Sequence, residues 1–135
     1  MDLSIIIVNY KTKDLTIQTI DSVYKADKPP GKLEVFLIDN ASNDRTPKEV
    51  RKKFPQVKVI ELPENLGFAG GNNPGLRKAK GRYQLLLNSD TIIEKDTLTT
   101  MIKLMDKDPK IGLSTCRLNL VNGKIDPASH RGFPT

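Results

Sequence analysis

Short apolar runs alternate along the chain with stretches whose apolar residues return every three to four positions. Runs rich in leucine and β-branched residues are typical of strands buried in a parallel sheet, and the intervening spacing is typical of amphipathic helices. The expected order is β-α-β-α-β-α-β-α-β, an α/β fold with a mainly parallel sheet and helices on both faces. The predicted strands are Leu3–Val8, Leu33–Ile38, Val57–Leu62, Tyr83–Leu87 and Ile111–Leu118.

The first two helices have recognisable start signals. Apolar residues in Lys13–Ala26 are spaced along one helical stripe, and Asp14 is its expected N-cap. The second helix begins with the form of a capping box, in which Thr46 is the N-cap, Pro47 is the first helical residue and Glu49 reaches back. Each helix would therefore begin shortly after the strand that precedes it.

The later helices are predicted from glycine and proline as much as from periodicity. A third helix should begin within the glycine-rich stretch of residues 63–75 and run to Lys80, with Gly81 as its stop. Apolar positions from 98 to 105 predict a fourth helix, which ends at Asp108-Pro109. Asn122-Gly123 predicts a hairpin turn.

Polar residues follow three of the predicted strands directly. They are Asn9-Tyr10, Asp39-Asn40 and Asn88-Ser89-Asp90. The carboxyl ends of parallel strands share one edge of the sheet, where open α/β sheets bind ligands. A lone carboxylate such as Asp90 can hold a divalent cation against a phosphate, because Mg²⁺ commonly takes one or two carboxylates and fills its other positions with phosphates and water. These residues predict a site for a nucleotide diphosphate.

The glycine-rich loop has neither of the common phosphate-binding signatures. It contains no G-x-G-x-x-G pattern and lacks the Gly-Lys-Ser/Thr ending of a P-loop. It carries Asn65, Asn72 and Asn73 instead, whose carboxamides can both donate and accept hydrogen bonds. Such groups suit sugar hydroxyls or the edge of a base, and they equally suit tight turns, so both interpretations stay open.

Composition restricts the class of protein further. The chain of 135 residues suits one domain, with a net charge of +6 whose basic clusters fit either anionic partners or solvated helix faces. Aromatic residues make up 5% and tryptophan is absent, so a nucleic-acid platform of stacking aromatics has little material, and no nucleic-acid partner is expected. The single cysteine, Cys116, and the lack of a signal sequence or long apolar span predict a cytoplasmic protein.

Four segments in order resemble the inverting family 2 glycosyltransferases, particularly a rhamnosyltransferase-like subgroup. Each follows or contains a predicted strand end, and Arg131-Gly132-Phe133-Pro134 adds modestly to the likeness. The four together are specific, although the first alone would be weak. The segments are Ile6-Ile7-Val8-Asn9-Tyr10, Ile38-Asp39-Asn40-Ala41-Ser42-Asn43-Asp44, Asn65-Leu66-Gly67-Phe68-Ala69-Gly70-Gly71-Asn72-Asn73 and Leu87-Asn88-Ser89-Asp90-Thr91.

The resemblance implies a GT-A (Rossmann-like) fold, a dTDP- or UDP-sugar donor and a Mg²⁺ or Mn²⁺ ion. It places Asp39 at the pyrimidine base and Asp90 at the metal, as the last residue of an Asp-x-Asp motif whose first position here is Asn88. The nucleotide-binding residues that it implies, with their polar neighbours, are Asn9, Tyr10, Asp39, Asn40, Gly67, Phe68, Asn72, Asn88 and Ser89.

The resemblance also implies direct displacement at the anomeric carbon, with inversion, toward a glycan or lipid-linked acceptor. The candidate sugar is rhamnose. Family members place the carboxylate base further along the chain, so the base is expected beyond Thr135; Asp126 lies in the wrong context and His130 is expected at the surface. Residues 1–135 are thus expected to form the nucleotide-sugar-binding part of a glycosyltransferase domain, truncated before its acceptor-binding half.

Two alternatives stay open. The chain could be a catalytically incomplete nucleotide-binding or interaction module, with uncovered apolar residues favouring a homodimer. It could also be a sugar nucleotidyltransferase, although that class would need an N-terminal glycine-rich activating loop and residues 9–13 contain no glycine. For the glycosyltransferase interpretation, peripheral association with the inner face of the membrane is compatible with the expected cytoplasmic location.

Overall fold

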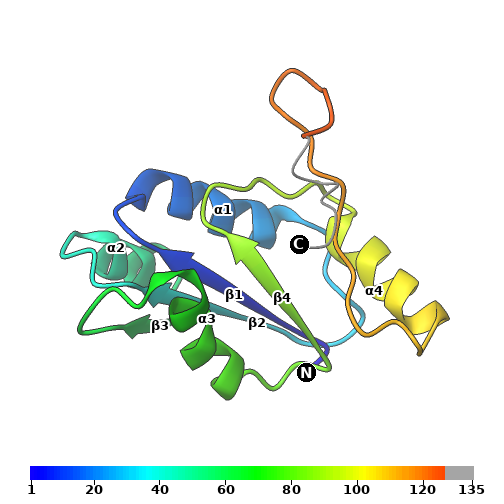
Figure 1. Ribbon diagram of the computed structural model, residues 1–135, viewed down its shortest axis with the longest axis horizontal. Coiled ribbons are helices and arrows are strands. Elements are labelled where there is room, and N and C mark those ends of the chain that lie inside the picture. Colours follow the sequence, from blue (N-terminus) through cyan, green and yellow to red (C-terminus); the bar gives the residue numbers. More distant parts are fainter. Residues whose placement is uncertain (127–135) are drawn as a thin grey trace, which may run out of the picture. The chain divides into compact units, whose positions relative to one another are not determined.

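The computed structural model describes residues 1–126 of the chain, in two compact units (Figure 1). Residues 1–100 hold the sheet and most of the helical structure, and the described part of the second unit is residues 101–126. The segment Arg131-Gly132-Phe133-Pro134 and His130 lie outside the described residues.

Four parallel strands form the sheet in the order β3-β2-β1-β4. Leu3 pairs with both Leu33 and Tyr83, so the three longer strands start level. Each of these three strands extends one residue further than predicted, onto its first polar residue, because a hydrogen-bonded ladder requires only backbone groups. The strands are β1 (Leu3–Asn9), β2 (Leu33–Asp39), β3 (Lys58–Glu61) and β4 (Tyr83–Asn88).

Helices cover both faces of this sheet, as expected for an α/β fold. One face is packed by α3, where Ile6, Phe36 and Ile38 form a buried cluster against Leu76. The alternate residues of the strands point to the other face, where buried Ile20 of α1 adds to the core. The helices are α1 (Lys13–Lys25), α2 (Thr46–Lys53), α3 (Gly67–Lys78) and α4 (Thr97–Lys107), the last crossing from one unit into the next.

Close packing of α3 on the sheet depends on two glycines. A Cβ at Gly71 would lie 2.8 Å from Cγ1 of Val8, and one at Gly75 would lie 2.8 Å from Cγ2 of Ile6. Real Cβ atoms do not make such contacts, so larger residues would push the helix away from the strands. The glycine-rich stretch therefore serves the packing of α3 along its length as well as the loop before it.

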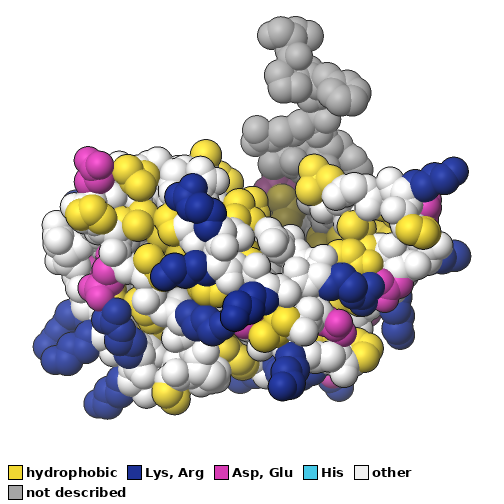
Figure 2. All heavy atoms as spheres, turned by 90° about the horizontal axis from the view of Figure 1, so that it is seen from below, with side chains coloured by type: hydrophobic (Ala, Val, Ile, Leu, Met, Phe, Trp, Pro, Cys, Tyr) yellow, Lys and Arg dark blue, Asp and Glu magenta, His cyan; other side chains and the backbone are white. Residues whose placement is uncertain are grey.

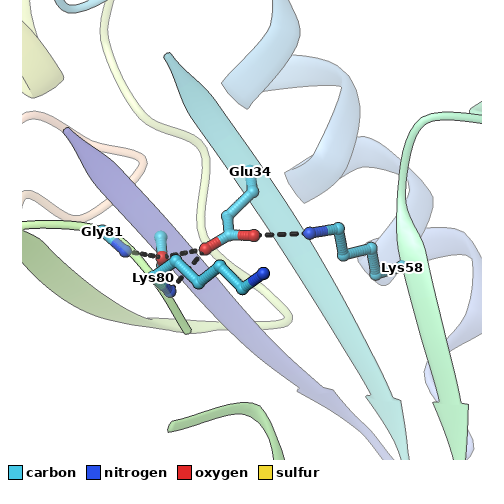
Figure 3. Close-up of polar contacts among 5 residues, drawn as sticks. Glu34, Lys58, Lys80 and Gly81 are labelled. Carbon is cyan, nitrogen blue, oxygen red and sulfur yellow. Dashed lines mark hydrogen bonds and ion pairs between the residues drawn. The ribbon is translucent and has the colours of Figure 1, made fainter. Parts of the chain in front are cut away.

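A buried carboxylate ties the amino ends of the strands together (Figure 3). Glu34 accepts hydrogen bonds from Lys58 Nζ at 2.6 Å, from Ser4 Oγ at 2.5 Å and from the Lys80 backbone N–H at 2.7 Å. The Ser4 hydroxyl oxygen in turn accepts from the Gly81 N–H at 2.8 Å. Burial raises the pKa of Glu34, but the hydrogen bonds from Lys58, Ser4 and Lys80 outweigh burial and hold that pKa below its ordinary value.

The fifth predicted strand, Ile111–Leu118, is wrong. Residues 108–126 form no strand of the sheet: their only β-pairing is one isolated antiparallel bridge, between Asn119 and Ile125, and Leu113 is 91% exposed. A strand requires a partner for its backbone groups, which apolar sequence alone does not supply. The predicted turn at Asn122-Gly123 is confirmed, since the Leu120 N–H donates to the Lys124 carbonyl across it at 2.7 Å.

The first helix begins at Lys13 as predicted, but the predicted N-caps are wrong. Asp14 lies within the first turn of α1, and Thr12 precedes that helix. Thr46 is already helical, its N–H donates to Asp44 Oδ1 at 2.9 Å, and its own hydroxyl is buried without a partner among the described residues. Glu49 pairs with Lys13 at 3.2 Å and does not reach back.

The third helix ends at Lys78, two residues before the predicted end at Lys80. The Ala79 backbone is extended, with φ of −62° and ψ of 133°. This bend lets the Lys80 N–H donate to Glu34 at 2.7 Å. A tertiary hydrogen bond to a charged group thus replaces the last helical turn.

The lysine and arginine residues that cluster along the sequence are exposed in the structure. Figure 2 shows Lys and Arg side chains projecting among hydrophobic and acidic ones on one face of the molecule. Within residues 1–126, no helix combines the length and apolar character that a membrane crossing requires. The exposed positions are Lys48, Arg51, Lys52, Lys53, Arg77, Lys78, Lys80 and Arg82.

Candidate functional site

A cleft of about 370 Å³ lies at the carboxyl ends of the strands. The chain passes from β1 to β2 and β3 on one side, then returns through α3 to β4 on the other side of β1. Ligands of open α/β sheets bind in the crevice that such a reversal creates. The cleft is lined by Val8, Tyr10, Thr12, Asn40, Asn65, Gly67, Phe68, Asn88, Ser89 and Asp90.

The structure brings most of the predicted site residues to this cleft and leaves three behind its wall. Asn9, Asp39 and Asn72 are buried and are not part of the lining. They act on the cleft through the residues that they hold. The predicted residues on the lining are Tyr10, Asn40, Gly67, Phe68, Asn88, Ser89 and Asp90.

Two aromatic side chains and a glycine form the part of the cleft that suits a nucleoside. Tyr10 is 44% exposed and Phe68 is 60% exposed, so both present apolar surface on which a base could stack. Gly67 has φ of +71°, and a Cβ there would meet no atom within 4 Å. The backbone at Gly67 is thus open to a ligand.

Asn9 is the buried hub behind the cleft. Its Nδ2 group donates to Asp39 Oδ1 at 2.7 Å and to Ser42 Oγ at 3.0 Å. Its Oδ1 atom accepts from the hydroxyls of Thr16 at 2.7 Å and Thr12 at 3.1 Å. Both amide hydrogens and both lone pairs are therefore used within the protein, and the side chain orients its neighbours.

Asp39 and Asn40 hold the loops at the end of β2. The Asp39 carboxylate accepts from Asn9 and, through Oδ2, from the Ser42 N–H at 3.2 Å. The Asn40 amide donates to the Gly67 carbonyl at 2.9 Å and accepts from the Leu66 N–H at 2.8 Å. Asn40 thus clamps the start of α3 against the sheet. The role of Asp39 at a base stays a prediction.

Asn72 supports the same wall from within α3. Its Nδ2 group donates to the Phe68 carbonyl at 2.9 Å, one helical turn earlier. A side-chain amide that bonds to its own helix stabilises that turn and leaves less capacity for a ligand. Contact between Asn72 and ribose stays a prediction.

The turn after β4 carries the candidate metal ligand. Asp90 is exposed, lines the cleft and makes no hydrogen bond or ion pair with the rest of the described chain. No group of three or more His, Cys, Asp or Glu in residues 1–126 could hold a metal alone. One carboxylate with amide and hydroxyl oxygens nearby is a hard donor set that fits Mg²⁺ or Mn²⁺ only when phosphate and water complete the coordination.

Sequence reasoning missed three threonines, Thr12 directly before α1 and Thr16 and Thr19 within it. Thr12 lines the cleft, Thr16 bonds Asn9, and the Thr19 hydroxyl donates to the Ser89 carbonyl at 2.8 Å. The spacing of four and then three residues places them on one helical face. This polar stripe, running beside the apolar stripe of the same helix, was the signal that could have identified them.

Comparison with known proteins identifies the family. The family described as Glycosyl transferase family 2 matches residues 4–131. Poly-beta-1,6-N-acetyl-D-glucosamine synthase of Staphylococcus epidermidis is 30% identical over 84% of this chain and 27% of its own length. Poly(ribitol-phosphate) beta-N-acetylglucosaminyltransferase TarS of Staphylococcus aureus is 30% identical over 96% of this chain and 23% of its own length. The chain spans about a quarter of these relatives.

Solved structures show the same fold. The mannosyltransferase PcManGT from Pyrobaculum calidifontis, in complex with GDP-Man and Mn²⁺, has a TM-score of 0.75 and 32% identity over 82% of this chain and 33% of its own. S. aureus TarS 1-349 in complex with UDP has a TM-score of 0.72 and 25% identity over 92% of this chain and 43% of its own. The expected GT-A fold is confirmed, and the rhamnosyltransferase-like subgroup stays a prediction.

Proposed function

This chain belongs to glycosyl transferase family 2, and we propose that it forms the donor-binding part of an enzyme that transfers a sugar from a nucleotide diphosphate to a glycan or lipid-linked acceptor. The observation that carries the proposal is that a carboxylate-bearing turn and two exposed aromatic rings line one cleft. Asp90 lies with Asn88 and Ser89 at one wall, and exposed Phe68 and Tyr10 lie on the same lining. A nucleoside and a metal-bound diphosphate require such neighbours.

Each wall of the cleft has a distinct role in this proposal. The rings of Tyr10 and Phe68 bind the base, and Asn40 keeps the Gly67 backbone in place beside the nucleoside. Asp90, with Asn88 and Ser89 beside it, would hold the divalent ion. The ion supplies positive charge to the departing diphosphate when bound. The PcManGT complex with GDP-Man and Mn²⁺ supports this assignment.

The base that deprotonates the acceptor is proposed to come from outside this cleft. Among the described residues, Asp90 is the only carboxylate on the lining, and it is assigned to the metal. Asp39 is buried and already accepts hydrogen bonds from Asn9 and Ser42. A general base must reach the acceptor hydroxyl directly or through one water, so neither carboxylate suits that task.

The donor is proposed to be a pyrimidine nucleotide, with rhamnose as the candidate sugar. The complex of TarS with UDP supports a pyrimidine. The complex of PcManGT carries GDP-Man, so a purine is the competing outcome. Asp39 beside the nucleoside wall is the residue through which the protein would distinguish the two kinds of base.

Calorimetric titration with dTDP, UDP and GDP, each with and without MnCl₂, tests the proposal. We expect one pyrimidine nucleotide to bind more tightly than GDP and to gain affinity when Mn²⁺ is present. Tighter binding of GDP would contradict the pyrimidine assignment alone. Absence of binding for all three, with folding verified by circular dichroism, would contradict donor binding by this chain.

A second candidate function is that of an interaction module that pairs with another copy. Its support is the apolar surface of residues 111–126, where Leu113, Val121 and Ile125 are exposed. Contiguous exposed apolar surface favours association. Sedimentation equilibrium over a range of concentrations would show a dimer in that case, and a strictly monomeric protein would count against it.

A further inference from the structure

The polar face of α1 reaches the turn that carries Asp90. Thr12, Thr16 and Thr19 follow one another along the face of the helix that meets the ends of β1 and β4. Thr16 donates to Asn9 and lies 3.3 Å from the Thr12 hydroxyl without contacting Ser89, whereas Thr12 and Thr19 both contact Ser89. Ser89 is thus held from α1, a segment about seventy positions earlier in the chain.

Thr19 holds the backbone of the turn. Its side chain is almost fully buried, and its hydroxyl lies 2.8 Å from the Ser89 carbonyl and 3.0 Å from the Leu15 carbonyl. The Leu15 carbonyl also accepts the ordinary helical hydrogen bond from the Thr19 N–H. The Ser89 carbonyl lies beyond the end of β4, so the sheet ladder does not provide its donor. The hydroxyl of Thr19 provides that donor.

Thr12 holds the side chain of the turn. Its hydroxyl donates to Asn9 Oδ1 at 3.1 Å and lies 3.3 Å from Ser89 Oγ. With the Thr12 proton directed to Asn9, the Ser89 hydroxyl can donate to Thr12. Thr12 and Ser89 thus link the buried Asn9 side chain to the turn that carries Asp90.

We propose that Thr12 and Thr19 are positioning residues, which fix Ser89 and thereby direct the neighbouring Asp90 carboxylate toward a metal-bound diphosphate. The inference rests on the proposed donor-binding function. Asp90 makes no polar contact of its own within the described chain, so its position depends on the backbone at Ser89. Binding geometry has to be held to within about 0.5 Å, which an unanchored turn does not achieve.

The test compares Thr19→Val and Thr12→Val with a matched control at another buried threonine of the same unit, Thr46→Val. The affinities for UDP, dTDP and GDP are measured with and without MnCl₂, and the quantity compared is the gain in affinity that Mn²⁺ produces. We expect Thr19→Val to reduce this gain about 3- to 10-fold and Thr12→Val to reduce it less, the range of one net hydrogen bond. Thr19→Ser should restore it.

Thr46→Val should leave the gain from Mn²⁺ unchanged, because the Thr46 hydroxyl has no hydrogen-bond partner among the described residues and Thr46 does not line the cleft. If Thr46→Val reduces the gain as much as Thr19→Val, or if neither Thr12→Val nor Thr19→Val changes it, the positioning role is wrong while donor binding stands. If the unmodified protein gains no affinity from Mn²⁺ with any nucleotide, the metal site fails, and the positioning role fails with it. Thr12 is partly exposed, so its variant remains informative if Thr19→Val does not fold.

Discussion

Glu34 at the amino edge of the sheet is 5% exposed and accepts hydrogen bonds from Lys58, Ser4 and Lys80, whereas Asp90 at the carboxyl edge is exposed and bonds to nothing in the described chain. The two carboxylates belong to the same parallel sheet, one strand length apart. A buried charge needs partners to compensate for lost hydration. An exposed carboxylate without protein partners remains able to bind a ligand. The comparison separates groups that hold the fold from groups that are left available to bind.

Among residues 1–126, left-handed backbone conformations of non-glycine residues lie near the carboxyl edge of the sheet and not near its amino edge. In residues 1–126, the non-glycine residues with positive φ are Lys11 at 54°, Ala41 at 59° and Asn43 at 53°, and all three follow the carboxyl ends of β1 or β2. The left-handed conformation costs about 1 to 2 kcal/mol for such residues. Strained backbone near a cleft is typical of sites whose geometry matters more than local stability.

Two glycines test whether the amino edge of the sheet contributes more to stability than the loop at the cleft. A Cβ at Gly81, at the amino edge, would collide with the backbone N of Ser4 and lie 2.7 Å from the Leu3 carbonyl carbon, whereas one at Gly67 would meet nothing within 4 Å. Gly81→Ala should lower the free energy of unfolding by about 3 kcal/mol. Gly67→Ala should lower it by about 1 kcal/mol, through its φ of +71°. Urea denaturation measures both, and equal losses would contradict the comparison.

Asp90→Ala should affect binding and leave folding intact. We expect the affinity for the preferred nucleoside diphosphate in the presence of Mn²⁺ to fall on the order of 100-fold, equivalent to about 2.7 kcal/mol. The melting temperature should stay the same because the side chain is exposed and unpaired. Asp96→Ala, at another exposed carboxylate in the same unit, is the control. Unchanged affinity for Asp90→Ala would show that the metal assignment is wrong.

In contrast to Asp90→Ala, Glu34→Gln should lower stability and leave nucleotide binding intact. Hydrogen bonds to charged groups contribute about 1.5 to 3 kcal/mol, and we expect a loss of about 2 kcal/mol at neutral pH with nucleotide affinity unchanged. The pKa of Glu34 is lower in the folded protein than its ordinary value of 4.5. Its stabilisation is therefore complete above that value and is lost as the pH falls through the folded pKa. The difference in unfolding free energy between the two proteins should shrink on acidification, and a constant difference would contradict the charged role.

Thr46→Val should slightly raise the free energy of unfolding, whereas the glycine and Glu34 variants lower it. The Thr46 hydroxyl is buried at the start of α2, beyond the carboxyl end of β2, and has no hydrogen-bond partner among the described residues. Replacing an unsatisfied hydroxyl by a methyl group of similar size should stabilise the fold by about 1 kcal/mol. Thr46→Ser keeps the hydroxyl and serves as the control. Destabilisation by Thr46→Val would mean that the hydroxyl has a partner in solution.

The four strands and most of the cleft lining could be predicted because their signals are local. The apolar runs of the central strands β1 and β2 are buried, whereas Leu86 of β4 is 44% exposed. Asn88, Ser89 and Asp90 come to the ligand-binding edge because they end β4 or follow it directly. The hub at Asn9 and its contacts with Thr12 and Thr16 could not be predicted in this way. Those contacts depend on how α1 is rotated against the sheet, which is decided by packing across the core.

The wrong sequence predictions also concern features that tertiary contacts decide. Residues 111–118 have the composition of a strand, but a strand forms only where another backbone pairs with it. The capping box at Thr46 has the required sequence, but Asp44 takes the N–H of Thr46 and Lys13 takes the carboxylate of Glu49. Lys80 leaves the predicted helix because Glu34 accepts its N–H.

The sequence by itself determined the alternation of strands and helices, the polar strand ends and the position of Asp90, since hydrophobic periodicity and chain order are local properties. Only the tertiary structure decided which polar groups are buried and paired and which stay free. Glu34 and Asp90 are both carboxylates beside strand ends in the sequence. Their different roles follow from the atoms that surround them, because the free energy of a charge is set by its hydration and its partners.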